Sequence, residues 1–324
     1  MRIYAPLCTT FRFWCVNDAS NIHPLFLTFF EGDTMKKSNS QLFKDIVAKR
    51  PRALHTLTNR SLKGDYDACY HLAFAHLKNC MTEQGKTNVE AASKGIAFLQ
   101  RAACGSHAGA LFALGKLHLH GVVVAQDPQK GHSLIELASH AGHSDAQGLV
   151  SQKILTNATC DEDVLTAIQL AEISANHGSA EGDYALGHCA YHKLFPDKQK
   201  NQNFMAFLEK SAEKGNAKAM YALFNAQLES KQIPELALLH KAAEKSHLLA
   251  CQQLALCYLT GKHISQNMAK ACIYYKFSQK EAPPLVNQWL ANCGEGYQKE
   301  VELELMQRRT AQQQNLIASL HRLN

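Results

Sequence analysis

The chain has 324 residues, of which 46% are hydrophobic and 19% are charged, with a formal net charge of +6 at pH 7. This balance is ordinary for a folded soluble protein and argues against a disordered chain. The basic residues form no block and are not interleaved with aromatic residues at one spacing, so we expect no nucleic-acid partner. No run of about 18 apolar residues occurs, so we expect no membrane span.

The cysteines number 11, and they do not recur at a fixed position along the chain. Only Cys257 and Cys272 are spaced to bridge two helices of one structural unit. The pattern favours small buried thiols in a reducing compartment over a disulfide framework. We therefore expect a cytoplasmic protein, with an exported or periplasmic one as the alternative.

Residues 1–40 carry many aromatic side chains without helical or strand periodicity. Leu25–Phe30 is too short for a secretory core, and no small-residue cleavage site follows it. We expect an irregular or disordered segment. One hypothesis is that Met35, followed by Lys36-Lys37-Ser38, is the native start.

Residues 41–66 are predicted to form a helical N-terminal cap. Leu42, Phe43, Ile46 and Val47 lie on one face of a helix, and Pro51 interrupts it before Gly64.

Residues 67–282 show a repeating pattern, in which an Ala-rich helix end meets a small residue and a new apolar helix follows. The small residues lie 31 to 41 residues apart, at Gly64, Gly105, Gly142, Gly178, Gly215 and Ser246. A period in this range is typical of stacked helical units, none of which buries its apolar face alone. The pattern predicts about six helical hairpins.

The hairpin after Gly105 shows the signals most fully. Gly121 is predicted to end its first helix in a left-handed conformation, and Asp127 to cap a second helix that opens with Pro128. Gly115 and Gly187 are small enough to let two helix backbones approach closely.

Residues 283–324 are predicted to form a C-terminal capping helix after Pro283-Pro284, and then a polar helical tail. The tail has an apolar stripe formed by Val301, Leu305, Leu316, Leu320 and Leu323. Arg309 and Gln312 interrupt this stripe, which makes it a poor coiled coil. The tail either packs back on the last repeat or makes a weak dimer contact, so we expect a monomer or a weak dimer.

Two stretches resemble the Sel-one-like repeat (SLR) family, which is related to tetratricopeptide repeats. They are Leu114–Gly121 with Gln126-Asp127 and Ala138–Gly142, and Leu254–Gly261 with Ala269-Lys270-Ala271. The resemblance covers roughly residues 60–285. It implies an all-α fold, a right-handed α-solenoid of stacked antiparallel helix pairs. It also implies an adaptor or scaffold that gathers other proteins, in bacteria often linked to signalling, the envelope or host contact. The repeat after Gly142 lacks the paired glycines, and the one after Gly215 is short.

The possible chemical sites are weak. His188 and His192 are spaced to share one helix face, but no acidic residue stands where a zinc protease places its general base. No phosphate-binding glycine loop is present. We therefore predict no metal, no cofactor and no enzyme activity; a hydrolase or another enzyme on a helical scaffold is the alternative.

The predicted site is the concave face formed by the first helix of each repeat, where a protein or peptide partner would lie. Its candidate residues are polar side chains on those helices: Lys116, His118, Gln152, His188, His192 and Asn225.

Overall fold

A computed structural model describes residues 37–50, 52–78, 80, 87–230, 233–278 and 282–321. The chain divides into two compact units, Met1–Ser38 and Asn39–Asn324, and all the helices described below belong to the second. The predicted irregular segment, apart from its last residues, and the proposed start at Met35 lie outside the described residues.

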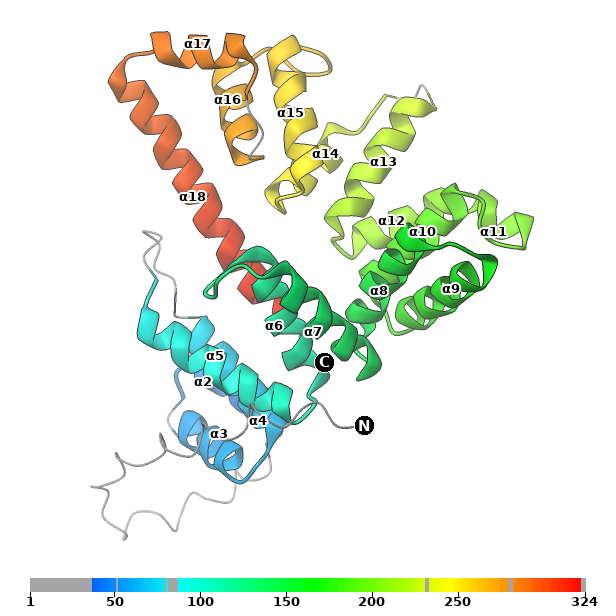
Figure 1. The fold of residues 1–324 in the computed structure, drawn as a ribbon. Coiled ribbons are helices and arrows are strands. Elements are labelled where there is room, and N and C mark those ends of the chain that lie inside the picture. The colour runs from blue at the N-terminus through cyan, green and yellow to red at the C-terminus, as the bar shows by residue number, and fades with distance from the viewer. Residues whose placement is uncertain are drawn as a thin grey trace. The chain divides into compact units, whose positions relative to one another are not determined.

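The elements of the described part are all helices (Figure 1). The cap region holds α2 (Asn39–Val47) and α3 (Ala53–Leu62). The repeat region holds α4 (Tyr66–Leu77), α5 (Val89–Cys104), α6 (Ala108–His120), α7 (Pro128–His140), α8 (Ser144–Asn157), α9 (Asp161–Asn176), α10 (Ala180–Tyr191), α11 (Lys198–Gln202), α12 (Phe204–Glu213), α13 (Ala217–Glu229), α14 (Leu236–Glu244), α15 (Leu248–Thr260) and α16 (Met268–Phe277). The C-terminal region holds α17 (Pro284–Asn292) and α18 (Glu295–Leu320).

The helices of the repeat region pack as consecutive pairs. The pairs are α4 with α5, α6 with α7, α8 with α9, α10 with α12, α13 with α14, and α15 with α16. Each pair also contacts the next one along the chain. The predicted all-α class, a solenoid of stacked helix pairs, is confirmed. The leading members of the pairs, α4, α6, α8, α10, α13 and α15, are called the first helices below.

The boundaries of the pair α6–α7 follow from local chemistry as predicted. Gly121 ends α6 with a φ of 63°, in the left-handed region. Asp127 accepts a hydrogen bond from the backbone N–H of Lys130 at 3.0 Å, and Pro128 is the first residue of α7.

Gly105 ends α5 for a different reason. Its φ is −83°, and the left-handed position falls on Ser106 instead, with a φ of 57°. A Cβ at Gly105 would lie 2.2 Å from the Tyr66 ring, so this glycine is required by a close approach of α4.

Three first helices begin with a histidine cap. The Nδ1 atoms of His107, His143 and His247 accept the backbone N–H three residues ahead, at 3.2, 3.4 and 3.2 Å. Each imidazole also packs on an aromatic ring of the preceding first helix, with centroid distances of 4.7, 4.2 and 4.9 Å. These rings belong to Tyr70, Phe112 and Tyr221. The histidines thus join neighbouring repeats and satisfy helix ends at the same time.

Small residues set the closeness of the helix pairs, as the sequence predicts. A Cβ at Gly115 would lie 2.8 Å from Ile135 Cγ1 and 3.0 Å from the Gly131 carbonyl oxygen. A Cβ at Gly187 would lie 2.8 Å from Leu208 Cδ2. Larger side chains would separate α6 from α7 and α10 from α12.

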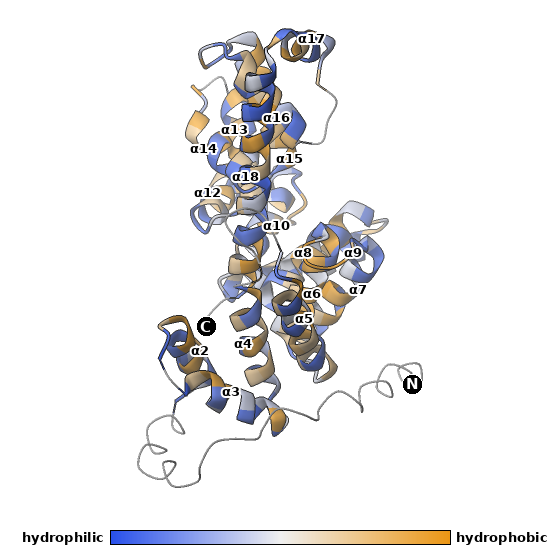
Figure 2. Cartoon of the chain, turned by 90° about the vertical axis from the view of Figure 1, so that its left-hand side faces the viewer, coloured by the Kyte–Doolittle hydropathy of each residue, from blue (hydrophilic) through white to orange (hydrophobic). Residues whose placement is uncertain are grey.

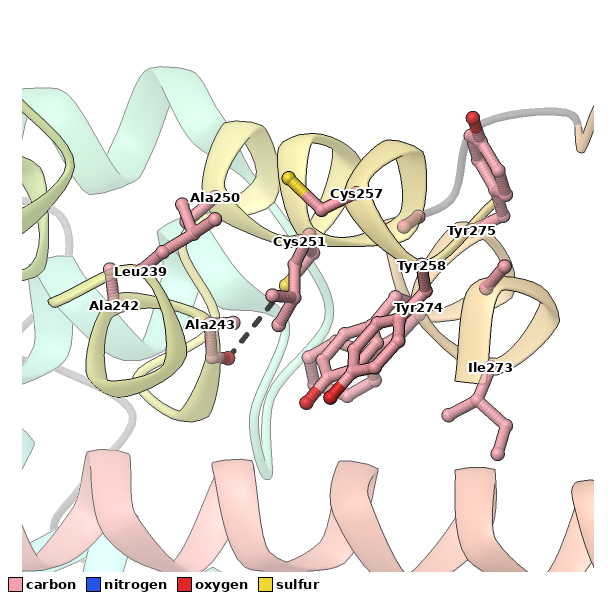
Figure 3. Packing of buried hydrophobic residues seen from close by; sticks show 14 of the residues in the cluster. Leu239, Ala242, Ala243, Ala250, Cys251, Cys257, Tyr258, Ile273, Tyr274 and Tyr275 are labelled. Carbon is pink, nitrogen blue, oxygen red and sulfur yellow. Dashed lines mark hydrogen bonds between the residues drawn. The ribbon is translucent and has the colours of Figure 1, made fainter. Parts of the chain in front are cut away.

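The core runs between the helices, most of which carry both hydrophobic and hydrophilic residues (Figure 2). In the last repeats the Tyr258 and Tyr274 rings stack in parallel, 5.9 Å apart and at 7° (Figure 3). Beside them the Cys251 thiol donates to the Ala243 carbonyl oxygen at 3.7 Å. In these last repeats the core is therefore continuous through small and aromatic side chains.

The cysteines of the described part are all free, including Cys257 and Cys272. Burial raises the pKa of Cys189 and Cys251 to about 12, so both remain thiols at neutral pH. These thiols act as small apolar side chains, as expected.

The helix α18 packs on the last repeat, one of the two alternatives for the tail. Val301 and Leu305 are buried in one cluster with α16 residues. The helix also contacts α6, far away in sequence, which the sequence did not predict. Leu320 is buried and Leu316 half-buried, while Leu323 lies outside the described residues. Among the described helices, none has the length and hydropathy needed to cross a bilayer.

Candidate protein-binding site

A pocket with a volume of about 360 Å³ opens where α6, α7 and α8 meet, and a side chain from the start of α13 completes it. Its lining combines polar and charged side chains with apolar ones. The lining residues are Lys116, Leu119, His120, His132, Ile135, Glu136, Leu149, Val150, Gln152, Lys153, Thr156 and Lys218.

Gln152 is the centre of the hydrogen bonds in this region. Its amide nitrogen donates to Glu181 Oε2 at 2.9 Å and to the Glu181 carbonyl oxygen at 3.3 Å. Its amide oxygen accepts from Lys218 Nζ at 2.7 Å. The Lys218 ammonium also lies 4.0 Å from Glu181 Oε2 and 5.7 Å above the Tyr184 ring. Side chains from α8, α10 and α13 are therefore held together across three helix pairs.

Lys116 enters the same region from α6. Its side chain is half-buried, and its ammonium makes no hydrogen bond or ion pair with any residue that the structure describes. Burial lowers its pKa, the Lys218 charge lowers it further, and Glu181 and Asp145 partly oppose this shift. Lys116, Gln152, Glu181 and Lys218 are called the polar cluster below.

Two of the predicted site residues, Lys116 and Gln152, thus come together in one pocket. His118 does not join them. It is buried, and its Nδ1 lies 3.3 Å from the Ala125 carbonyl oxygen, on the connection to α7. Asn225 lies half-buried on α13, outside the lining of this pocket.

His188 and His192 are neighbours, with ring centroids 4.4 Å apart. Burial lowers the pKa of His188, and the nearby His192 lowers it further. In the part of the chain that the structure describes, no third histidine, cysteine or carboxylate joins them in a group suited to a metal ion. The pair contributes a polar patch on α10.

The sequence did not single out Glu181 and Lys218, although a signal was present. Both are the second residue of a first helix, α10 and α13, and Asp145 holds the same position in α8. Charges at equivalent positions of consecutive repeats line up along the stack. Comparing the residues at the second position of each first helix would have identified Glu181 and Lys218.

The titratable groups with shifted pKa values include one group that lies together, Asp67, His71 and His321, and others at separate places. Lys116 and His120 line the pocket, whereas Cys189 is on α10, His247 precedes α15 and His321 follows α18. Burial is the largest cause of the pKa shift in Lys116, His120, Cys189, His247 and His321.

Comparisons with known proteins agree with the helix pairing. The Sel1 repeat family model matches residues 67–107, 108–143 and 248–278, which contain the pairs α4–α5, α6–α7 and α15–α16. No curated protein matches the sequence.

Solved structures of Sel1-type proteins resemble this chain in fold. A protective antigen of uropathogenic Escherichia coli that displays an SLR fold is 19% identical, with a TM-score of 0.50 over 90% of this chain. The match covers 65% of that antigen, slightly less than two thirds of its length. A Sel1 repeat protein from Oxalobacter formigenes is also 19% identical, with a TM-score of 0.49 over 75% of this chain and 99% of its own.

Sel1 repeat proteins are typically protein-interaction scaffolds. The chain therefore contains three Sel1 repeats, which are set in a continuous stack of helix pairs.

Proposed function

We propose that the chain is a non-enzymatic adaptor that binds a segment of another protein across α6, α8, α10 and α13. The observation that carries this proposal is the Lys116 side chain, which is half-buried in the pocket and has the charges of Glu181 and Asp145 nearby, but no hydrogen bond or ion pair of its ammonium with the described residues. A sheltered charge without a partner is costly, and a bound carboxylate removes much of that cost. The partner segment therefore presents an Asp or Glu side chain to Lys116.

The remaining polar cluster favours a peptide over an isolated small anion. The Glu181 carboxylate can accept more hydrogen bonds than the one from Gln152, and the Lys218 ammonium has N–H groups besides the one that it donates to Gln152, so the surface can bind both N–H and C=O groups. Its side chains come from several consecutive repeats, an arrangement suited to an extended ligand. The Asp or Glu of the partner would fix the position of the segment at Lys116. The other residues of the polar cluster would bind the backbone on either side of it.

The setting we propose is bacterial, in signalling, the envelope or host contact, with the chain itself in the cytoplasm. The support for the setting is the likeness in fold to a protective antigen of a uropathogenic bacterium. The free cysteines of the described part agree with a reducing compartment.

Selection from a displayed peptide library tests the proposal, because it can be carried out before the partner is identified. The purified chain is expected to enrich peptides that contain Asp or Glu. Lys116→Met keeps the length of the side chain and removes its charge, so it should weaken those peptides about 10- to 100-fold, the loss of one charge-assisted bond.

Lys130→Met is the matched control. Lys130 is exposed on α7 and does not line the pocket, so this variant should bind the same peptides as the native chain. Equal binding by the native chain and Lys116→Met would contradict the proposed site.

A further inference from the structure

The last turn of α18 lies on an aromatic surface formed by α2 and α4. Four residues define this surface, called the cradle below: Phe43, Tyr70, His71 and Phe74. In Figure 1 α18 runs from α17 towards α6, so its end reaches the first repeats. The contact joins residues 250 positions apart in the sequence.

Two polar contacts fix the helix end. The Tyr70 hydroxyl donates to the Leu320 carbonyl oxygen at 2.9 Å. His71 Nδ1 and His321 Nε2 are 2.8 Å apart, so one imidazole donates and the other accepts. The first contact satisfies a carbonyl that has no partner within the helix itself, because the last turn of any helix is left open.

Apolar contacts complete the cradle. The His321 ring lies 4.1 Å from Phe43 and 4.7 Å from Phe74, measured between centroids. Ile317 and Leu320 are buried in the same cluster as the cradle aromatics. The cradle thus holds two apolar side chains three residues apart, a helix end and one aromatic ring.

Few residues of α18 are buried for a helix of its length. Its buried residues are five out of 26: Val301, Leu305, Thr310, Ile317 and Leu320. Val301 and Leu305 pack against the last repeat. Beyond Thr310 the buried residues of the helix are Ile317 and Leu320, and Leu316 is half-buried beside them. A helix with the same end groups and a larger apolar face would bury more apolar area on this surface than α18 does.

We propose that the cradle is a helix-binding site, which α18 fills in the free chain and an amphipathic helix of a partner protein fills in the complex. The partner helix carries apolar side chains at the spacing of Ile317 and Leu320 and ends at the cradle. In this kind of recognition an amphipathic helix lays its apolar face on an apolar surface. Here α18 of the same chain would compete with the partner helix for that surface. The cradle is separate from the pocket of Lys116, so the two proposals stand independently.

The probe for the test is a fluorescent synthetic peptide with the sequence of residues 306–321. Binding is measured by anisotropy to the full chain and to the full-length double variant Ile317→Asp/Leu320→Asp, whose own helix end no longer fits. The double variant should bind the peptide at least about tenfold more tightly than the native chain. A control peptide with Asp at the same two positions should bind neither protein.

Circular dichroism shows whether the double variant is folded. A second measurement uses the native chain alone: an excess of the peptide should speed hydrogen exchange of residues 311–321, because their own helix end is displaced, and leave α4 protected. The proposal fails if the folded double variant does not bind the peptide, or if it binds the control peptide equally well. It also fails if the native chain forms a dimer that the double variant does not, because a second copy would then be the occupant.

Discussion

The histidine caps show how one residue type serves several roles in this chain. His107, His143 and His247 each accept a helix N–H and pack on a ring of the preceding repeat. Acceptance at Nδ1 requires an imidazole whose Nδ1 carries no proton. A histidine cap of this kind is therefore lost when its Nδ1 takes up a proton.

His247 gives a direct test of this sensitivity. Burial, and then the Lys218 charge, lower its pKa to about 4 from an ordinary value of 6.5. Between these values the unfolded chain binds a proton that the folded chain does not, so the contribution to stability is complete above pH 6.5 and is lost as the pH falls towards 4.

His247→Asn keeps a good capping residue and removes the titration. Urea unfolding at pH 7 and pH 5 should show a smaller loss of stability for His247→Asn than for the native chain. His247→Ala should lose about 1 kcal/mol at pH 7, the usual value of an N-cap. An identical pH dependence of the native chain and His247→Asn would contradict the role of the imidazole.

Residues whose role is local could be predicted from the sequence. Gly121 and Asp127 end and start helices through their own backbone and side-chain chemistry, which does not depend on the rest of the fold. Lys116, Glu181 and Lys218 meet only because consecutive repeats stack, and Ser106 takes the left-handed position beside a glycine. Their roles depend on tertiary packing, which the local pattern does not contain.

At the scale of the helices, close packing replaces the paired glycines that the repeat after Gly142 lacks. A Cβ at Gly148 would lie 2.6 Å from the Gly182 backbone nitrogen. A Cβ at Gly182 would lie 2.4 Å from the Ala175 backbone nitrogen and 2.6 Å from Ser174 Oγ. Glycines on α8 and α10 therefore bring α8, α9 and α10 together. These small residues serve the same purpose as those of the other repeats, although their positions in the repeat differ.

Gly182→Ala is expected to lower the stability by about 1–3 kcal/mol, because the added methyl group meets backbone atoms that cannot move independently. Gly296→Ala is the matched control. It lies on α18 with no atom within 4 Å of an added Cβ, so it should be neutral or slightly stabilising. The unfolding midpoint in urea measures both. Equal midpoints for the two variants would show that α8, α9 and α10 tolerate a wider separation.

The helix α18 was predicted as an element, and its contact with the last repeat was one of two alternatives. Its contact with α4 was not predicted, because nothing in the stripe of Val301, Leu305 and Leu320 states which surface each residue meets. The cradle aromatics Phe43 and Tyr70 are spread over two helices of ordinary composition. The contact of α18 with these helices depends on how the helix pairs are arranged in space, which the sequence pattern does not give.

At the scale of the whole chain, the described repeats bury their apolar residues in successive clusters, and the proposed site uses polar residues of the first helices. The family model matches repeats at both ends of the stack, whereas the pairs α8–α9 to α13–α14 depart from its pattern. The polar cluster draws Gln152, Glu181 and Lys218 from this divergent part. The middle of the stack is therefore the part most suited to a partner specific to this chain.

Site-specific photo-crosslinking in cells that express the full chain tests this account most directly. A photoreactive residue replaces Thr156, which lines the pocket, or Thr166, which is exposed on α9. The two threonines are matched, because each hydroxyl donates to the carbonyl oxygen four residues before it. The account predicts a crosslinked partner protein from position 156 and none from position 166. An adduct from position 166 alone, or no adduct from position 156, would contradict it.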